Sequence, residues 1–146
     1  MNPYFPHTPG SYCLLLFLAQ RTRITVGRLG SFEFKRGYYL YVGSAFGPGG
    51  VSARVRRHLV RDKRKHWHID YLRAEATVKA VWADCRDGNM EHQWAKGLLK
   101  CSTECDPIHQ FGCSDCTCPS HLFYFKRSPD AGILAQGKYL IQFRIS

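Results

Sequence analysis

Residues 38–61 read YYLYVGSAFGPGGVSARVRRHLVR, and this stretch predicts a strand, a glycine-rich turn and a basic helix in succession. Tyr38–Val42 is aromatic and β-branched, a composition that favours a pleated, half-buried strand. The segment from Gly43 to Gly50 holds four glycines and a proline, so we expect the strand to break at Gly43 and the chain to turn tightly there.

The helix that follows is expected to have an apolar face and a basic face. Its apolar residues recur four positions apart, which is the period of one helix face. These residues are Val51, Val55 and Leu59. Arg54, His58 and Arg61 fall on a neighbouring face of the same helix. The strand would deliver Tyr41 to the loop beside Arg54 and His58, and a hydroxyl, a guanidinium and an imidazole together suit phosphate chemistry.

Length and charge place the chain among small basic globular proteins. It has 146 residues, 45% of them apolar, which is enough for one domain with a core. We expect a single domain over residues 1–146, in which residues 1–9, with their three prolines, form a loose N-terminal arm. The formal charge of +10 favours a polyanionic partner, nucleic acid first and an anionic membrane second. A basic protein that is merely soluble is the alternative.

Location is predicted from what the sequence lacks. The apolar run Cys13–Ala19 is too short to span a bilayer, and the first twelve residues do not resemble a signal peptide. Seven cysteines are an odd number, so reduced thiols are expected rather than a disulfide framework. The sequence therefore predicts a cytoplasmic protein with no membrane partner, and it leaves the oligomeric state open.

The periodicity of the chain predicts an α+β fold, with a mostly antiparallel sheet flanked by helices. Four opening strands are expected to form a meander, and two later strands close the chain. The expected strands cover 10–19, 23–26, 31–35, 38–42, 77–84, 122–126 and 138–144. Helices are expected from about Gly50 to Arg61, briefly around Trp67 to Leu72, and from an Asn89 cap to about Lys100, with Met90, Trp94 and Leu98 on the buried side.

A basic run extends the face of the helix that carries Arg54. Seven basic residues and one acidic residue lie between Arg54 and Lys65. Such a run often forms only a solvated surface, but here phosphate contact is favoured, and contacts of this kind position a nucleic acid without reading its sequence. The predicted nucleic-acid-binding residues are Arg56, Arg57, Arg61, Lys63, Arg64 and Lys65.

Three groups of residues have spacings that suit metal binding, each with a structural alternative. His66, His68 and Asp70 would share one face of an extended segment, unless the segment is the short helix packed by Trp67. Glu91, in the first turn of its helix, would complement the helix dipole or bind a metal. Four further ligands would hold a structural zinc, unless their thiols are small core residues. They are Cys113, Cys116, Cys118 and His121.

Several motifs together resemble the GIY-YIG nuclease superfamily. Gly10-Ser11-Tyr12 and Tyr41-Val42-Gly43 are similar to its paired signature, Arg54-x3-His58 is similar to its catalytic helix, and Glu91 stands where the family places a metal-binding carboxylate. Segments 41–45, 67–72 and 111–122 resemble an uncharacterised prokaryotic branch, so the resemblance covers the chain from Gly10 to about Tyr124.

The chain departs from the family pattern in four places. Ser11 replaces the usual isoleucine, a hairpin lengthens the gap between the two signatures, and the loop 47–50 sets Arg54 further from Gly43. A late asparagine that many members use has no clear counterpart. Its candidate replacements are Ser114, Asp115 and His121.

The resemblance implies hydrolysis of phosphodiester bonds in nucleic acid, with DNA favoured over RNA, by one Mg²⁺ or Mn²⁺ ion held by Glu91. Arg54 would pair with the non-bridging oxygens, and Tyr12 would orient or deprotonate the attacking water. Tyr41 would position the water or the phosphate, and His58 would relay a proton because the usual pKa of histidine is near neutral. The alternatives are a nucleic-acid-binding module that is catalytically weak or inactive, and a zinc-stabilised adaptor.

Overall fold

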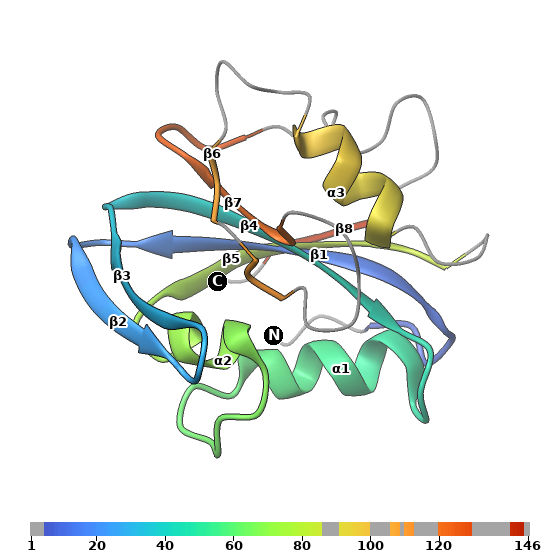
Figure 1. Ribbon diagram of the computed structural model, residues 1–146. Helices are drawn as coiled ribbons and strands as arrows, with labels where there is room; N and C mark the ends of the chain where they lie inside the picture. The colour runs from blue at the N-terminus through green and yellow to red at the C-terminus, as the bar shows by residue number, and fades with distance from the viewer. Residues whose placement is uncertain are drawn as a thin grey trace.

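The computed structural model describes residues 5–85, 91–99, 106–108, 110–112, 120–129 and 141–144. It shows an antiparallel six-stranded sheet with helices on both faces (Figure 1), which confirms the predicted α+β class. The strands are β1 (Gly10–Leu18), β2 (Thr22–Val26), β3 (Gly30–Phe34), β4 (Gly37–Ala45), β5 (Thr77–Asp84), β6 (Asp106–Pro107), β7 (Leu122–Phe125) and β8 (Ile141–Arg144). The helices are α1 (Gly50–Leu59), α2 (His68–Arg73) and α3 (Glu91–Leu99).

The central strand β1 is buried on both faces, as its apolar sequence predicts. It lies between β4 and β5 in a sheet of order β6-β7-β4-β1-β5-β8. Because successive side chains of a strand alternate between faces, β1 supplies both cores of the protein. Tyr12 and Leu14 enter one core, whereas Cys13 and Leu15 enter the other.

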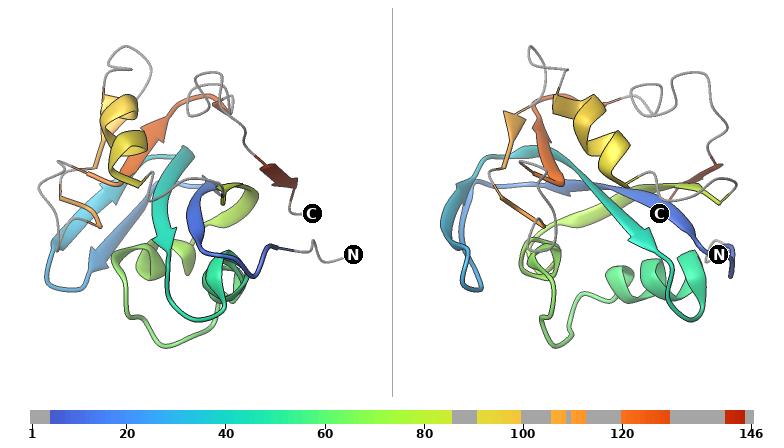
Figure 2. Two further views of the ribbon diagram at one scale, coloured as in Figure 1. Left: turned by 90° about the vertical axis from the view of Figure 1, so that its right-hand side faces the viewer. Right: turned by 45° about the vertical axis from the view of Figure 1, so that its right-hand side comes forward.

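The two cores lie on opposite faces of the sheet. Helices α1 and α2 cover one face, and α3 covers the other, as the two views of Figure 2 also show. Trp94 and Leu98 of α3 are buried against the second face, as predicted, while Asn89 and Met90 lie outside the described residues. None of the described helices is long and apolar enough to cross a bilayer.

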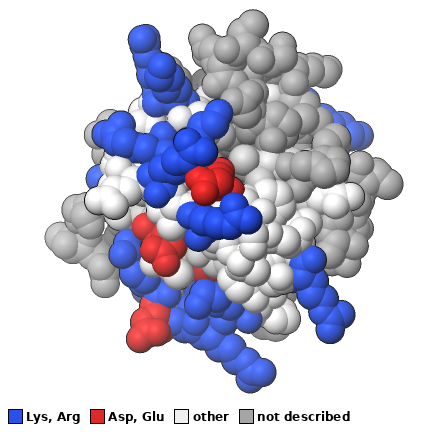
Figure 3. Space-filling model, turned by 60° about the vertical axis from the view of Figure 1, so that its left-hand side comes forward, with Lys and Arg blue, Asp and Glu red and all other residues white. Residues whose placement is uncertain are grey.

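The predicted four-strand meander is wrong, because β1 pairs directly with β4. Their register runs from Gly10 opposite Ala45 to Leu18 opposite Gly37. Strands β2 and β3 instead form a separate two-stranded sheet. Their inward side chains, among them Ile24 and Phe34, are buried in the core on the α1 face, so the hairpin folds over the sheet instead of extending it. The side of the molecule that carries this hairpin is rich in lysine and arginine (Figure 3).

The strand β4 does not break at Gly43 as predicted, but continues to Ala45. Gly43 lies directly opposite Tyr12 in the ladder. The pairing with β1 therefore overrides the preference of glycine for turns. The chain turns only after β4, where Gly49 and Gly50 have φ angles of 83° and 61°.

Residues 5–9 are not the loose arm that their prolines predict. Phe5 is only 1% exposed and belongs to the core on the α1 face. The carbonyls of Thr8 and Pro6 accept hydrogen bonds from the backbone N–H groups of Val51 and Ser52, at 3.0 and 2.7 Å. This segment thereby satisfies N–H groups of the first turn of α1, which lack partners within the helix.

Helix α1 ends at Leu59, two residues before the predicted Arg61. Its last carbonyls accept hydrogen bonds from side chains that follow. Lys63 Nζ donates to the Arg57 carbonyl at 2.9 Å, and Arg73 Nε donates to the His58 carbonyl at 2.9 Å. Cations at this end also complement the helix dipole.

We expect Phe5→Ala to lower the free energy of unfolding by about 3 kcal/mol, since it removes a buried aromatic ring. Phe46→Ala is the matched control, because Phe46 is 48% exposed and should lose less than about 0.5 kcal/mol. Chemical denaturation of both variants measures the difference. Equal effects would show that residues 5–9 do not belong to the core.

Candidate active site

Tyr12 and His58 form a buried hydrogen-bonded pair between β1 and α1. The Tyr12 hydroxyl lies 2.7 Å from His58 Nε2, and the two residues are 1% and 0% exposed. Gly43 makes this contact possible, because a Cβ atom at that position would lie only 2.5 Å from the Tyr12 hydroxyl oxygen. The glycine of the second signature therefore provides the space that lets Tyr12 reach the helix.

His58 is buried with the apolar residues of α1 and does not share the basic face of Arg54 and Arg61 as predicted, and it is not poised to titrate near neutral pH. Burial lowers its pKa to about 3; the negative charge of Asp70 opposes this shift, and the cations Lys63, Arg54 and Arg57 add to it. His58 is therefore neutral at pH 7. Its Nδ1 is buried and has no hydrogen-bond partner among the described residues.

The burial of His58 follows a pattern already present in the sequence. Val51, Val55 and His58 stand at positions i, i+4 and i+7, which form one face of a helix, and all three are buried. Leu59, which we predict on that face, is only half-buried. Because basic residues surround His58 in the sequence, the charge pattern assigns it to the basic face of the helix, and its place in the apolar periodicity is missed.

Tyr41 lies within β4 rather than at a loop as predicted. It stands opposite Leu14 in the ladder and is 8% exposed. Its ring packs edge-on against those of His58 and Phe111, with centroid distances of 6.0 and 6.3 Å. The second signature tyrosine is thus close to the Tyr12–His58 pair, in the same core.

Arg54 lies at the surface next to this cluster. Its guanidinium carbon is 4.4 Å from the centroid of the Trp67 ring, and the same ring packs against His58 at 5.8 Å. Within the described part of the chain, Arg54 has no hydrogen bond and no ion pair. Trp67 therefore contacts both the Arg54 guanidinium and the His58 ring of the buried pair.

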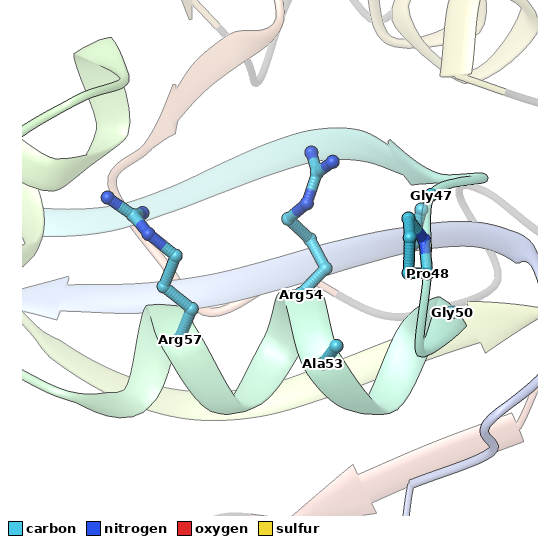
Figure 4. A pocket seen from close by; sticks show the side chains of 7 residues that line it. Gly47, Pro48, Gly50, Ala53, Arg54 and Arg57 are labelled. Atoms are coloured by element: carbon cyan, nitrogen blue, oxygen red, sulfur yellow. The ribbon is translucent and has the colours of Figure 1, made fainter.

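A pocket of about 180 Å³ opens in front of Arg54. Figure 4 shows Arg54 and Arg57 on the same side of α1, with the glycine-rich loop at the far end of the pocket. Ala45, Gly47, Pro48, Gly50, Ala53, Arg54 and Arg57 line it. Since the N–H groups of Val51 and Ser52 already bond to residues 6–8, an anion in this pocket would rely on Arg54 rather than on these two N–H groups of the helix N-terminus.

Arg57, a predicted nucleic-acid-binding residue, is fixed by an ion pair with Asp70, although its side chain is still 31% exposed. Two guanidinium nitrogens donate to the two carboxylate oxygens, each at 3.0 Å, and the Asp70 side chain is fully buried. The guanidinium carbon of Arg57 also lies 4.2 Å from the centroid of the Trp67 ring. Arg57 and Arg54 thus both pack on Trp67, but only Arg57 is fixed by a carboxylate.

Residues 68–73 form helix α2, which confirms the predicted short helix and rules out the alternative in which His66, His68 and Asp70 alternate on an extended segment. Asp70 Oδ2 accepts the backbone N–H groups of His66 and Trp67, at 2.7 and 2.9 Å. Burial alone would raise the pKa of Asp70, but Arg57 and these N–H groups outweigh it and hold the pKa below its ordinary value. His68 Nδ1 accepts the N–H of Gly112. These groups serve the fold.

Some of the remaining basic residues donate hydrogen bonds to backbone carbonyls, and others do not. Lys63 donates to carbonyls at the end of α1, and Arg61 donates to the Ala76 carbonyl. Arg73, which we do not single out from the sequence, is buried and caps the same helix end. Of the six predicted nucleic-acid-binding residues, Arg56, Arg61, Arg64 and Lys65 are exposed, and of these four only Arg61 donates to a backbone carbonyl of the described residues.

The two predicted metal sites stay predictions. Glu91 begins α3 on the opposite face of the sheet from the Tyr12–His58 pair, and its side chain lies outside the described part. Cys113, Cys116 and Cys118 lie there too. The fourth predicted zinc ligand, His121, is 1% exposed, and its backbone bonds to Phe111 and Val42.

His58 should make stability depend on pH below neutrality. Its folded-state pKa is below the ordinary value of 6.5, so only the unfolded chain takes up a proton as the pH falls through 6.5. We expect the free energy of unfolding to fall by about 2 kcal/mol more in the wild type than in His58→Gln between pH 7 and pH 5. Urea titrations at each pH measure this dependence, and the exposed His66→Gln is the control, which should show the same dependence on pH as the wild type. The same dependence on pH in His58→Gln as in the wild type would contradict the assignment.

Removing the charge of Asp70 should destabilise the fold. Asp70→Asn leaves Arg57 without its counter-ion, and we expect a loss of roughly 3 kcal/mol. Asp62→Asn removes a carboxylate that is exposed, and should cost less than about 0.5 kcal/mol. Equal thermal and chemical stability of the two variants would show that the Arg57–Asp70 pair does not support the fold.

Comparison with known proteins gives a family but no activity. The model of the family described as domain of unknown function DUF123 matches residues 11–139. None of the curated proteins and none of the solved structures compared with the chain matches it. The matched region contains Tyr12, Tyr41, Arg54, His58 and Glu91. The chain therefore belongs to the DUF123 family.

Proposed function

We propose that this protein is a nuclease of the GIY-YIG type, which binds a phosphodiester in the pocket beside Arg54 and hydrolyses it. The observation that carries the proposal is the Arg54 guanidinium. It faces a pocket, has no partner of its own in the described part of the chain, and shares Trp67 with the buried Tyr12–His58 pair. The order of motifs along the sequence supports the same assignment.

Arg54 suits the phosphate because its N–H groups are available. Packing on the Trp67 face restricts the guanidinium without using its hydrogen-bond donors. Those donors would pair with non-bridging oxygens, where negative charge develops during hydrolysis. Arg57 cannot substitute for it, since its fork is already bonded to Asp70.

Tyr12 is better suited to orient a water molecule than to deprotonate it. A tyrosine hydroxyl is a weak acid, and burial lowers the pKa of its partner His58 to about 3, so neutral His58 is a poor acceptor for the tyrosine proton. If the proton of neutral His58 is on Nδ1, the Tyr12 hydroxyl donates to Nε2 and its oxygen can accept a hydrogen bond from water.

The described cluster fits the phosphate better than it fits a metal ion. The carboxylate of Asp70 is bonded to this cluster through Arg57. Its oxygens already accept hydrogen bonds from Arg57, His66 and Trp67. A hard divalent ion needs oxygen ligands, so metal-dependent hydrolysis would rest on Glu91 with water and phosphate oxygens. When bound, Mg²⁺ or Mn²⁺ would polarise a phosphoryl oxygen.

A nucleic-acid-binding module with little catalysis is the second candidate. Two observations favour it: the signature tyrosines Tyr12 and Tyr41 are 1% and 8% exposed, and α3 lies on the far face of the sheet. A water molecule could reach Tyr12 only if the cluster opened. A measurement of nucleic-acid cleavage distinguishes this candidate from the nuclease.

The test is cleavage of labelled duplex, single-stranded and branched DNA and of structured RNA, with Mg²⁺, with Mn²⁺ and with chelator. We expect Arg54→Ala to lower the cleavage rate by about 10²–10³-fold, the usual effect of removing a donor that stabilises developing charge. Lys96→Ala is the matched control, because Lys96 is an exposed cation on α3, across the sheet from Arg54, and the variant should cleave at nearly the wild-type rate.

Glu91→Ala, run in parallel, tests the metal assignment. Metal-dependent cleavage that is lost in Glu91→Ala would support Glu91 as the ligand, whereas full activity in that variant would remove it from the site. Tight, salt-sensitive binding without cleavage in any metal would leave the binding module as the function.

A further inference from the structure

We propose that the outer face of the β2–β3 hairpin, together with Tyr71 and Lys65, forms a second contact surface for the phosphate backbone of a duplex nucleic acid. This inference rests on the proposed function, because it describes how a long substrate would extend beyond the pocket at Arg54. Neither the family resemblance nor the predicted basic run includes the hairpin.

The hairpin has an apolar side and a polar side. Ile24, Val26 and Phe34 point into the core. The opposite face carries Arg23, Thr25, Ser31 and Glu33, all exposed, and the Thr25 and Ser31 hydroxyls lie 2.6 Å apart. A two-stranded ribbon with such a polar face has the dimensions that a nucleic-acid groove admits.

The charge of the hairpin is strongly positive. Residues 21–36 contain five basic residues and one acidic residue, Glu33. Glu33 pairs with Arg21 at 2.6 Å and approaches Arg23 at 4.0 Å, but these side chains are 70%, 66% and 44% exposed for Arg21, Arg23 and Glu33. Exposed pairs of this kind contribute little to stability, so phosphates could replace the carboxylate. Figure 3 shows lysine and arginine side chains gathered on this side of the molecule.

Tyr71 of α2 lies between the hairpin turn and Lys65 of the predicted basic run. A Cβ atom at Gly27 would lie 3.4 Å from the Tyr71 hydroxyl oxygen, and Lys65 Nζ lies 5.9 Å from the centroid of the Tyr71 ring. Arg28 follows Gly27 and is exposed; it has no hydrogen bond or ion pair to any other described residue. Tyr71 and Lys65 thus lie next to the turn that carries the exposed Arg28.

This surface connects to the candidate active site. Trp67 lies two residues beyond Lys65 and packs on Arg54. The path from Arg54 through Trp67, Lys65 and Tyr71 to Arg28 therefore alternates cations with aromatic rings, a combination typical of surfaces that bind nucleic acid. A domain of 146 residues is roughly 35–40 Å across, which is about one turn of a duplex, so a duplex bound at the pocket could also reach the hairpin.

The experiment measures duplex DNA binding in chelator, as a function of salt, for wild type, Arg28→Glu, Arg23→Glu and Lys96→Glu. Lys96 is the matched control, since it is exposed on α3 across the sheet and its reversal changes the net charge equally. We expect the two hairpin variants to bind about tenfold more weakly, with a salt slope lower by about 1, and Lys96→Glu to bind within twofold of wild type. Unchanged melting temperatures would exclude misfolding.

Equal weakening in all three variants, or none in the hairpin variants, would overturn the inference while leaving the Arg54 site intact. A wild-type protein that cleaves or binds nucleic acid only through Arg54 would give this second pattern. A wild-type protein that neither binds nor cleaves any nucleic acid of the panel would overturn the proposed function, and this inference with it.

Discussion

The close approach of Tyr12 to Gly43 is the contact on which the rest of the structure depends. Two neighbouring central strands, β1 and β4, meet at this pair, and only a residue without a Cβ leaves space for the phenol ring. The hydroxyl can then reach His58, which ties α1 to the sheet. The contact between the sheet and α1 at His58 therefore depends on one missing side-chain atom.

A second constraint separates two arginines that look equivalent in the sequence. Arg54 and Arg57 both pack on Trp67, but of these two arginines only Arg57 bonds to the buried carboxylate of Asp70. A buried carboxylate requires compensation, so one arginine is committed to the fold. The other keeps its charge and its donors for a ligand. The chemistry of the site thus arises from an asymmetry that one acidic residue creates.

The local structure could be predicted well from the sequence, because apolar runs and periodicity determine it. Thr77–Asp84 is a strand with the predicted bounds, and α1 begins at Gly50 as expected. Long-range pairing could not be predicted: nothing local indicates that β1 skips the hairpin to join β4, or that Arg57 binds a carboxylate thirteen positions away. The sequence places Tyr12, Tyr41, Arg54 and His58 correctly in one neighbourhood, but not at the correct depth, because burial depends on which elements cover them.

The direct pairing of β1 with β4 gives the hairpin an unusual independence. The sheet register is complete from Gly10 to Ala45 without any contribution from β2 or β3. Inward residues such as Ile24 and Phe34 anchor the hairpin to the core, and its turn lies against Tyr71 of α2. The exposed face of the hairpin can therefore change in charge without disturbing the strands that carry Tyr12 and Tyr41. Under the proposed function, substitutions on the hairpin would change the binding of nucleic acid without changing the residues around Arg54.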